Sequence, residues 1–499
     1  RGSLIGEQGD GRMRGEVIPL MIGVKNYALL ESIKDAWDPE RIFNPGKITL
    51  TPKMNSSLRY EPGLDVKEPE TVFDFSGTHG ILRAAEQCNG SADCRKSAVI
   101  GGTMCPSYMA TKDENATTRA RANILREFLT NSEKKNRFDH EEIYQVMDLC
   151  LSCKGCKSEC PSNVDMARYK AEFLQHWHDA NGIPLRTRII ANISKLNKLG
   201  MIAPNIFNFF VTNTFTSGLM KKTLGFAPKR SIPTLYRMTL RAWLKRLSTS
   251  ENQEVIGKVF LFADEFTDFN DVEVGIKAVK LLNKLGYSVE IPVHVVSGRA
   301  FLSKGMVRKA KELAQKNISK LHNIVNDQTP LIGIEPSAIL SFRDEYPDLA
   351  GNELKTKALE LAPNCLMFDE FIIREIQKGN IEKSQFTDKK QSIKLHGHCH
   401  QKSLASTGPT KEMLSLPANY VVEEIKSGCC GMAGSFGYEK EHYTVSMQVG
   451  ELVLLPEVRK TSEYTIISAP GTSCRHQIKD GTGRTALHPI EVLYEALIK

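Results

Sequence analysis

The sequence has no apolar run long enough to cross a membrane as a helix. Of its 499 residues, 41% are apolar and 25% are charged. No stretch approaches the roughly 18–20 uninterrupted apolar residues that a spanning helix needs. No Gly-x-Gly-x-x-Gly follows a predicted strand, and the short match at Gly481-Thr-Gly483 is too weak to indicate a dinucleotide site. We therefore exclude an integral membrane protein and find no dinucleotide-binding fingerprint.

A strong excess of one charge is also absent. The 66 Lys and Arg residues and 58 Asp and Glu residues give a net charge of +8, which is spread along the chain. Nucleic-acid-binding proteins usually concentrate their basic residues on one face. The composition is that of a globular protein, for which we predict no nucleic-acid partner.

Cysteine, by contrast, is frequent and unevenly placed. Seven of the twelve cysteines lie in residues 88–160. Four more lie nearer the C-terminus: Cys399, Cys429, Cys430 and Cys474. Because the sequence shows no secretory leader after its Arg-Gly-Ser start, such close spacing favours metal or iron–sulfur ligation over disulfides. The remaining cysteine, Cys365, is expected to be a small buried apolar residue.

One run of cysteines has the spacing of a ferredoxin cluster motif, Cys150-x-x-Cys153-x-x-Cys156-x-x-x-Cys160-Pro161. Three thiolates separated by two residues can bind three corners of a cubane, and the fourth cysteine, before proline, usually ligates the other cluster of a two-cluster fold. Zinc sites usually consist of separated Cys-x-x-Cys pairs. We therefore predict a [4Fe-4S] cluster here rather than zinc or free cysteines.

An earlier segment, Cys88-x5-Cys94-x10-Cys105-Pro106, supplies the partner ligands. Because Cys105 also precedes a proline, we assign it as the fourth ligand of the cluster held by the Cys150 run. The other cluster would then have only three thiolates, those of Cys88, Cys94 and Cys160. It is either a [3Fe-4S] cluster or a [4Fe-4S] cluster with a further ligand such as Asp93 or His79, or it is absent.

The C-terminal set includes two adjacent thiols on a glycine-containing loop, Ser427-Gly-Cys429-Cys430-Gly-Met-Ala-Gly434. Both thiols can face one ion only if the backbone torsions there are unusual. The histidines around Cys399 are His396, His398 and His400, and for each one alone we expect a hydrogen-bonding role rather than ligation. The four C-terminal cysteines together predict an iron–sulfur or zinc site, or otherwise a redox-active dithiol.

The chain divides by composition into five segments. Residues 1–50 end in a short helix and a Pro/Gly turn, residues 51–75 are a polar linker, and residues 76–175 carry the first cysteines between helices. Residues 176–254 are helical, basic and free of cysteine. In residues 255–499 strands and helices alternate, which indicates an α/β unit. We therefore predict a multidomain protein with α+β and α/β parts.

The pattern also predicts individual elements and a faint repeat. We expect a helix at 119–129, strands at 258–263, 331–334, 393–395, 420–423 and 464–468, and further helices at 272–285 and 439–455. In each half of the last segment a strand, a loop, a helix and a later strand follow in the same order. Where the second half has its cysteines, the first half has Asp264 or Glu265, Val296-Ser297 and Ala338.

Several motifs resemble a flavoprotein family. Gly6-Glu7-Gln8-Gly9-Asp10-Gly11, followed by Asp38-Pro39 and Asn44-Pro45-Gly46-Lys47, looks like the end of the cap domain of flavin-linked D-2-hydroxyacid dehydrogenases of the vanillyl-alcohol-oxidase type. Residues 76–175 resemble their fused two-cluster ferredoxin module. Residues 255–499, with Gly428-Cys429-Cys430-Gly431, resemble the cysteine-rich domain of heterodisulfide reductase and of glycerol-3-phosphate dehydrogenase electron-transfer subunits.

The order of these segments is that of large fused bacterial dehydrogenases of the D-2-hydroxyglutarate dehydrogenase type. The resemblance covers nearly the whole chain and implies FAD and [4Fe-4S] clusters as cofactors. It also implies that residues 1–50 are the end of a FAD-linked oxidase domain, so we expect the chain to be the C-terminal piece of a longer protein.

Two departures from the family pattern affect the expected site. The resemblance makes Glu7 and Gln8 the catalytic residues and places Asn44 near the flavin ring, although by residue type Asn44-Pro45-Gly46 is simply a turn. The family has a histidine at the position of Gln8 that helps to hold the substrate carboxylate. An amide cannot carry positive charge and is a poor metal ligand, so Gln8 either keeps only an orienting role or alters substrate binding. In the C-terminal domain, moreover, only the second of two cysteine sets is intact.

The expected function is the iron–sulfur electron-transfer portion of a FAD-dependent D-2-hydroxyacid dehydrogenase of the D-2-hydroxyglutarate or D-lactate class. Electrons would pass singly from flavin through the clusters to a quinone or a carrier protein. Two alternatives stay open: a heterodisulfide-reductase-like thiol–disulfide oxidoreductase acting at Cys429-Cys430, and a zinc-held structural docking module.

The basic helical segment 176–254 has two interpretations. It is either a solvated connector or a peripheral contact with anionic lipid, which would bring the terminal cluster near a membrane quinone. The lack of a leader and the oxygen sensitivity of clusters predict a cytoplasmic location, with any membrane contact at the inner face.

Overall fold

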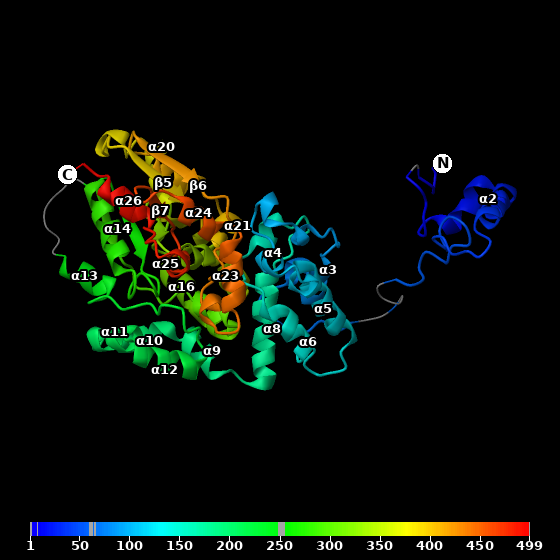
Figure 1. Cartoon of the computed structure of the whole chain (residues 1–499), viewed down its shortest axis with the longest axis horizontal. Coiled ribbons are helices and arrows are strands. Elements are labelled where there is room, and N and C mark those ends of the chain that lie inside the picture. Colours follow the sequence, from blue (N-terminus) through cyan, green and yellow to red (C-terminus); the bar gives the residue numbers. More distant parts are fainter. Residues whose placement is uncertain (1, 7, 59–62, 64–65, 248–254, 499) are drawn as a thin grey trace. The chain divides into compact units, whose positions relative to one another are not determined.

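The computed structural model describes residues 2–6, 8–58, 63, 66–247 and 255–498. Its backbone divides into two compact units, Arg1–Lys67 and Glu68–Lys499 (Figure 1). Mixed helix and sheet make up the second unit, in agreement with the predicted fold class. None of the described helices combines the length and the apolar content that crossing a bilayer requires.

Unit 1 consists of two helices and a long loop. Helix α1 (Ile18–Ile22) leads through Gly23 into α2 (Val24–Trp37). The buried Asp38 ends α2, because its carboxylate accepts the backbone N–H groups of Ile42 and Phe43 and pairs with Lys34 at 2.6 Å. Helix α2 buries no side chain within the unit, so its apolar residues are left uncovered there.

The cysteine-rich N-terminal part of unit 2 is helical. Its helices are α3 (Ile81–Glu86), α4 (Pro106–Thr111), α5 (Thr118–Asn131), α6 (Glu141–Asp148), α7 (Gly155–Glu159) and α8 (Met166–Asn181). The predicted helix at 119–129 is confirmed as α5. It begins where the Thr117 hydroxyl accepts the Ala120 N–H, and it buries Ala122, Leu125 and Leu129 along one face.

The segment predicted to be helical and basic does form helices. They are α9 (Leu185–Ala191), α10 (Ile193–Gly200), α11 (Pro204–Thr212), α12 (Thr214–Leu224) and α13 (Leu240–Arg246). In Figure 1, α10, α11 and α12 form a layer at one edge of unit 2. Polar contacts such as Asn197 to Asn270 and Asn208 to the backbone of Leu235 attach this layer to the rest of the unit.

Two parallel sheets form the C-terminal part of unit 2. The first has the order β2-β1-β3-β4, with strands Gly257–Phe262 (β1), Tyr287–Glu290 (β2), Leu331–Gly333 (β3) and Cys365–Met367 (β4). The second has the order β6-β5-β7, with strands Gln391–Leu395 (β5), Tyr420–Glu424 (β6) and Ile466–Ser468 (β7). In both sheets the first strand along the chain lies between the next two, so the topology repeats as the sequence pattern predicts.

Helices from both halves bury one shared core. Helix α14 (Val272–Lys284) packs on β2 and on α26 (Pro489–Glu495), and α20 (Phe368–Gln377) packs on α22 (Gly408–Leu414). Buried apolar residues of β1, β3, α20, α22 and α26 form a single cluster.

Other helices of this part are α15 (Arg299–Ser303), α16 (Val307–Leu321), α17 (Pro336–Ile339), α18 (Glu345–Leu349), α19 (Lys355–Leu361), α21 (Cys399–Leu404) and α25 (Thr472–Thr482).

One predicted helix is wrong in its extent. Residues 439–455 are not a single helix but α23 (Tyr443–Glu451) followed by the start of α24 (Leu454–Lys460), with an irregular backbone at Val453. The Glu439 carboxylate is paired with Lys304 and Arg186, which holds residues 439–442 outside the helix. The break lets α23 pack against α4 while α24 packs against α25.

A buried ion cluster joins α7 to the C-terminal part. Lys154, only 2% exposed, lies 3.3 Å from Asp165 and 3.1 Å from Glu345, and it also pairs with Asp344. Lys157 and Arg299 supply two further cations to the same acids. Burial opposes the charge of Lys154, but the carboxylates outweigh it and raise its pKa above the usual range. Three cations therefore balance three carboxylates at this joint.

We expect Lys154→Met to destabilise the protein strongly, because it leaves three buried carboxylates short of a counter-charge. Loss of one partner of a buried ionic group typically costs about 3–5 kcal/mol, which should lower the urea midpoint measured by circular dichroism. The matched control is Lys309→Met, whose ion pair with Glu312 lies at the surface and is worth less than about 1 kcal/mol. An unchanged midpoint in Lys154→Met would show that the cluster does not hold the parts together.

Candidate metal centres

The C-terminal cysteines converge because of the sheet topology. Cys399 follows β5, the Cys429-Cys430 pair follows β6, and Cys474 follows β7. These three strands are parallel neighbours, so the loops after their carboxyl ends meet at one edge of the sheet. All four cysteines are buried, and the sulfurs of Cys430 and Cys474 lie within 4.8 Å of each other.

The loop of the adjacent thiols depends on one glycine. Gly431 has φ of +92°, and a Cβ there would lie 2.2 Å from the carbonyl oxygen of Ser446. Only glycine fits this conformation and this approach. The unusual backbone torsion expected at the Cys429-Cys430 pair is therefore found at Gly431, the residue after the pair.

The four C-terminal thiols differ in acidity. The hydrogen bond with Cys429 lowers the pKa of Cys399 to about 7. Hydrogen bonds with Cys429 and Cys474 hold the pKa of Cys430 well below its usual range, and those same bonds raise the pKa of Cys429 and of Cys474. Thiolates are the metal-binding and nucleophilic form of cysteine, so Cys399 and Cys430 are the thiols best prepared for either role.

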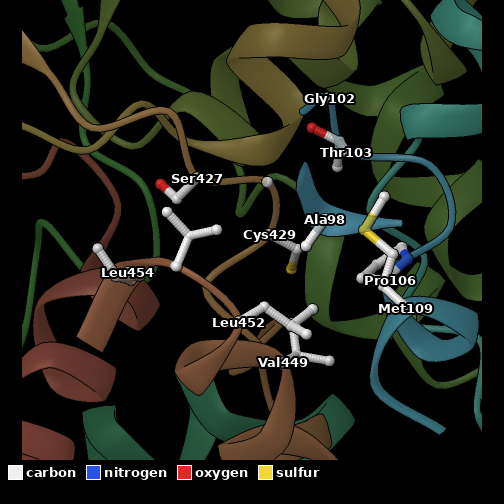
Figure 2. Close-up of a pocket in the computed structure, with 12 residues that line it drawn as sticks. Ala98, Gly102, Thr103, Pro106, Met109, Ser427, Cys429, Val449, Leu452 and Leu454 are labelled. Carbon is white, nitrogen blue, oxygen red and sulfur yellow. The ribbon is translucent and has the colours of Figure 1, made fainter. Parts of the chain in front are cut away.

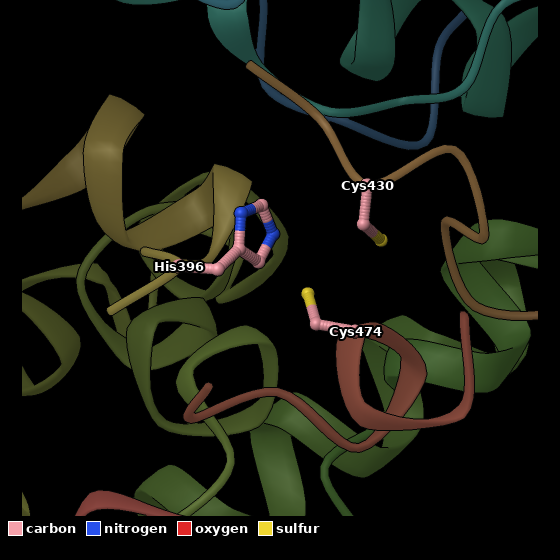
Figure 3. Close-up of side chains that lie close together, drawn as sticks. All are labelled: His396, Cys430 and Cys474. Atoms are coloured by element: carbon pink, nitrogen blue, oxygen red, sulfur yellow. The ribbon is translucent and has the colours of Figure 1, made fainter. Parts of the chain in front are cut away.

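His396 completes a compact donor set that residue spacing alone did not identify. One ring nitrogen of His396 and the sulfurs of Cys430 and Cys474 all lie within 4.8 Å of one another (Figure 3). The ring is fully buried; its Nδ1 lies 2.7 Å from Ser427 Oγ, and its Nε2 makes no hydrogen bond within the described residues. Ser427 Oγ itself donates to the carbonyl of Ile425, which favours a proton on Nδ1 and leaves the lone pair of Nε2 free. Burial also lowers the pKa of His396 and keeps it neutral.

This donor set suits a metal. Imidazole nitrogen and thiolate sulfur are the ligands of zinc and of many iron sites. A second hydrogen bond from the other ring nitrogen, as His396 makes to Ser427, is the usual way in which a ligating histidine is oriented. The residues present therefore fit a metal ion or an iron–sulfur centre held by His396 and the C-terminal cysteines.

The other two histidines have structural roles, as expected for each alone. The Nδ1 atom of His398 accepts the His400 N–H and caps α21. His400 Nε2 lies 3.0 Å from the carbonyl oxygen of Ser152. Helix α21 begins at Cys399, so the chain from His398 to His400 is not extended. Cys365 is fully buried, and the structure shows it in β4, away from both cysteine sets, as predicted.

The first cysteine set surrounds a buried arginine. Cys105 precedes α4, Cys150 follows α6, and Cys156 lies in α7, while Ser152 and Lys154 have positive φ and turn the chain between the cysteines. Arg121 of α5 is fully buried, and its guanidinium lies 3.5 Å from Cys105 Sγ. Although burial works against its charge, the thiols of Cys150 and Cys105 raise the pKa of Arg121. A fixed cation inside this group of sulfurs offsets the negative charge that a thiolate-bound cluster would bring.

The remaining cysteines of this part are less enclosed. Cys94 is buried in the short helical turn Asp93–Arg95, whereas Cys88 and Cys160 are half-buried. Burial and the neighbouring thiols of Cys105 and Cys88 raise the pKa of Cys94. The fourth ligand of this second set stays a prediction, as do the roles suggested for Asp93 and His79.

The two cysteine sets meet. Cys153 belongs to one buried apolar cluster with Cys399 and Cys429, and burial and the Cys399 thiol raise the pKa of Cys153. At the same place a Cβ on Gly428 would lie 2.7 Å from the carbonyl oxygen of Gly102, so only glycine permits this approach of the loops. Figure 2 shows a small pocket at this junction, with Cys429 in its wall and mostly apolar residues around it.

The loops after β1 and β3 in the first half carry buried carboxylates. Glu265, after β1, accepts hydrogen bonds from the backbone N–H and the hydroxyl of Ser297, after β2. Burial, aided by the charge of Glu265, raises the pKa of Asp264 to about 8. Glu335, after β3, accepts the N–H of Thr472 beside Cys474. Glu265 and Glu335 are therefore each hydrogen-bonded within the protein, and neither of their loops carries a thiol.

The N-terminal candidates are only partly described. Glu7 lies outside the described residues. Gln8 lies in an exposed turn, and Asn44 is exposed with φ of +49°. The Ile48 N–H donates to the carbonyl of Gly11 at 2.9 Å, which ties the segment after Asn44 to the segment after Gln8.

Comparisons with known proteins identify two of these parts. Residues 87–165 match the family model described as the 4Fe-4S dicluster domain, and residues 1–48 match that of the C-terminal domain of FAD linked oxidases. The D-2-hydroxyglutarate dehydrogenase of Escherichia coli (strain K12) is 26% identical over 542 residues, covering 99% of this chain and 52% of that protein. The enzyme of the same name from Pseudomonas putida is also 26% identical, over 99% of this chain and 51% of its own length.

Other relatives match shorter parts. A subunit of the anaerobic glycerol-3-phosphate dehydrogenase of Escherichia coli (strain K12) is 25% identical over 58% of this chain and 72% of its own length. Lactate utilization protein A of Bacillus subtilis (strain 168) is 27% identical over 47% of this chain and 98% of its own length. The chain spans about half the length of the D-2-hydroxyglutarate dehydrogenases that it matches.

These findings confirm the resemblance inferred from the motifs. The chain is homologous to D-2-hydroxyglutarate dehydrogenases along nearly all of its length. It combines a match to a 4Fe-4S dicluster domain with a match to the C-terminal domain of FAD linked oxidases. Iron–sulfur clusters and FAD are the cofactors that these parts support.

We expect Cys150→Ala to remove one cluster from anaerobically purified protein, because it deletes a thiolate from the set around Arg121. Iron and acid-labile sulfide per chain should fall by the content of one cluster, with a matching loss of visible absorption. Cys365→Ala is the matched control: it also removes a buried thiol, but from a site far from other cysteines, and should leave iron and sulfide unchanged. Equal iron in Cys150→Ala and the parent would contradict the assignment.

We expect His396→Ala to lower the metal content of the C-terminal centre without affecting the Cys150 cluster, because it removes one donor from the compact set. Metal per chain from mass spectrometry, together with the EPR spectrum of the reduced protein, separates the two centres. His140→Ala is the control, since His140 stacks on Phe128 in the helical part and has no cysteine partner. If metal content and spectrum both match those of the parent, His396 is not a ligand.

Proposed function

We propose that this chain is the iron–sulfur electron-transfer portion of a FAD-dependent D-2-hydroxyacid dehydrogenase of the D-2-hydroxyglutarate or D-lactate class. The observation that carries the proposal is the packing of Cys153, in the ferredoxin-type motif, against Cys399 and Cys429 of the C-terminal set. Two metal-binding sets that share one buried cluster would form a path for single electrons. Homology to D-2-hydroxyglutarate dehydrogenases over 99% of the chain supports the substrate class.

The ligand sets of this proposal rest on the spacing of the cysteines. We assign Cys105, Cys150, Cys153 and Cys156 to one [4Fe-4S] cluster. Cys88, Cys94 and Cys160 form the second set of the dicluster domain, either as a [3Fe-4S] cluster or with a fourth ligand that is not cysteine. The C-terminal centre, with iron–sulfur or zinc, is assigned to Cys399, Cys429, Cys430 and Cys474 together with His396.

When bound, the flavin supplies hydride acceptance from the substrate, and the clusters supply one-electron steps with little rearrangement. The residues of this chain provide the surroundings for those steps. Arg121 places a fixed positive charge beside the sulfurs of Cys105 and Cys150. Leu151, Phe436 and Val449 pack around the contact of Cys153 with Cys399 and exclude water from it.

At the flavin end, the proposal assigns roles to three N-terminal residues. Glu7 and Gln8 would contact the hydroxyacid, and Asn44 would lie near the flavin ring. The exposed positions of Gln8 and Asn44 in unit 1 are compatible with contacts to a cofactor and a substrate outside the unit. With an amide in place of the family histidine, Gln8 can donate a hydrogen bond to the substrate but adds no positive charge.

The acceptor in this proposal is a quinone or a carrier protein. The location is cytoplasmic, with a peripheral contact at the inner face of the membrane. Proximity of the C-terminal centre to that surface would allow electrons to leave the chain for a membrane quinone.

The decisive experiment is anaerobic purification of the chain. We expect a broad visible absorption band that dithionite bleaches, with iron and acid-labile sulfide bound. Addition of D-2-hydroxyglutarate or D-lactate should not bleach it, because this chain matches only the last part of a FAD-linked oxidase. A colourless protein with stoichiometric zinc and negligible iron would overturn the proposal and support a zinc-held docking module.

A second candidate function rests on the acidity of Cys430 beside Cys429. A low thiol pKa next to a second thiol suits a thiol–disulfide oxidoreductase. This function predicts turnover of a disulfide substrate that disappears in Cys429→Ser. In the dehydrogenase proposal, the parent chain has no such turnover.

A further inference from the structure

The layer formed by α10, α11 and α12 exposes many large apolar side chains, and apart from Val211 of α11 it buries small or polar ones. Helix α10 buries Ser194 and Asn197, and α12 buries Ser217. The side chains on the outside include Ile202, Ile206, Phe209, Phe210, Phe215 and Leu219, with Ile202 80% and Phe215 79% exposed. A helix at a water surface has the opposite arrangement. We call these six exposed residues the apolar face.

The chain segment that contains the apolar face is basic. The sequence contains no Asp or Glu between Asp179 and Glu251. Exposed basic residues of this stretch are Arg188, Lys195, Lys198, Lys222 and Lys229. Lys195, Lys198, Lys222 and Lys229 form no ion pair with any part of the chain that the structure describes. The layer therefore combines exposed apolar residues with exposed lysines.

We propose that α10, α11 and α12 lie on an anionic lipid surface, with the apolar face inserted at the boundary of headgroups and acyl chains. Short helices with aromatic and aliphatic residues outward and lysines around them bind bilayers in the interface plane. Lysines near an anionic leaflet add attraction. The cores of protein–protein interfaces are, by contrast, depleted in lysine. None of the described helices is long enough to span a bilayer, so the contact is peripheral.

The lipid-binding layer is fixed to the loop of the C-terminal centre. After α12, Ala227 N–H donates to the carbonyl of Tyr438, and the buried Arg230 donates to the carbonyl of Gly437 at 2.8 Å. Gly437 and Tyr438 follow directly on the loop of Cys429-Cys430. Arg186 of α9 also pairs with Glu439. The inference deepens the proposed function, since it names the surface that would bring this centre to a membrane quinone.

Binding to vesicles tests the inference without any electron transfer. Unilamellar vesicles of equal parts phosphatidylcholine and phosphatidylglycerol should pellet the chain at low salt, and vesicles of phosphatidylcholine alone should pellet much less. The triple variant Phe209→Ser/Phe210→Ser/Phe215→Ser should lower partitioning by about tenfold or more. Lys195→Gln/Lys198→Gln/Lys222→Gln should have a similar effect on the anionic vesicles and remove most of their salt dependence.

Matched controls lie elsewhere on unit 2. Val421→Ser/Tyr464→Ser changes two exposed apolar residues outside the layer, and Lys389→Gln/Lys390→Gln changes two exposed lysines; both variants should bind vesicles as the parent does. Failure of the parent to pellet, or equal loss in the controls, would overturn the inference. A dimer in gel filtration that the triple serine variant converts to a monomer, without vesicle binding, would also overturn it and assign the face to a second copy. Iron and sulfide contents are measured on the same samples, so loss of lipid binding is distinguished from loss of the clusters.

Discussion

The proposed function depends on the packing of Cys153 in one buried cluster with Cys399 and Cys429. Electrons can pass between two metal-binding sets only if the sets are held close together and kept from water. The chain achieves this with glycine at Gly428, where any side chain would collide with Gly102, and with the balanced ion cluster around Lys154. Apolar packing brings the surfaces together, and the ion cluster positions one part on the other.

Charge is arranged around sulfur in two different ways. In the helical part, the buried guanidinium of Arg121 lies beside the thiols of the ferredoxin-type motif. In the C-terminal part, neighbouring thiols lower the pKa of Cys399 and of Cys430, the second of which lies near the neutral ring of His396. The first half of the α/β part has the same topology but satisfies its buried groups internally, through Glu265 with Ser297. The repeat therefore gathers four cysteines in one half, whereas loops of the other half hold hydrogen-bonded carboxylates.

Sequence patterns were most informative where spacing acts locally. The strands β1, β3, β5, β6 and β7 and the helix α5 are found where apolar periodicity predicts them. β2 and β4 are not predicted; each becomes a strand through its pairing with a partner distant in the chain, β2 with β1 and β4 with β3. The predicted helix at 439–455 begins only at Tyr443 because Glu439 is engaged by Lys304 and Arg186, which are distant in the chain, and it is divided at Val453. Long-range contacts of this kind leave no local signal.

The sequence by itself determined which residues carry the chemistry: the spacing of Cys150, Cys153 and Cys156, the pair Cys429-Cys430, and the two families that these motifs resemble. Only the tertiary structure decided how they are combined. It joined three loops at one sheet edge, added His396 to the C-terminal thiols, and turned the apolar residues of α10, α11 and α12 outward. The physical reason is that ligand type is a property of single side chains, whereas distance, burial and exposure depend on which distant segments pack together.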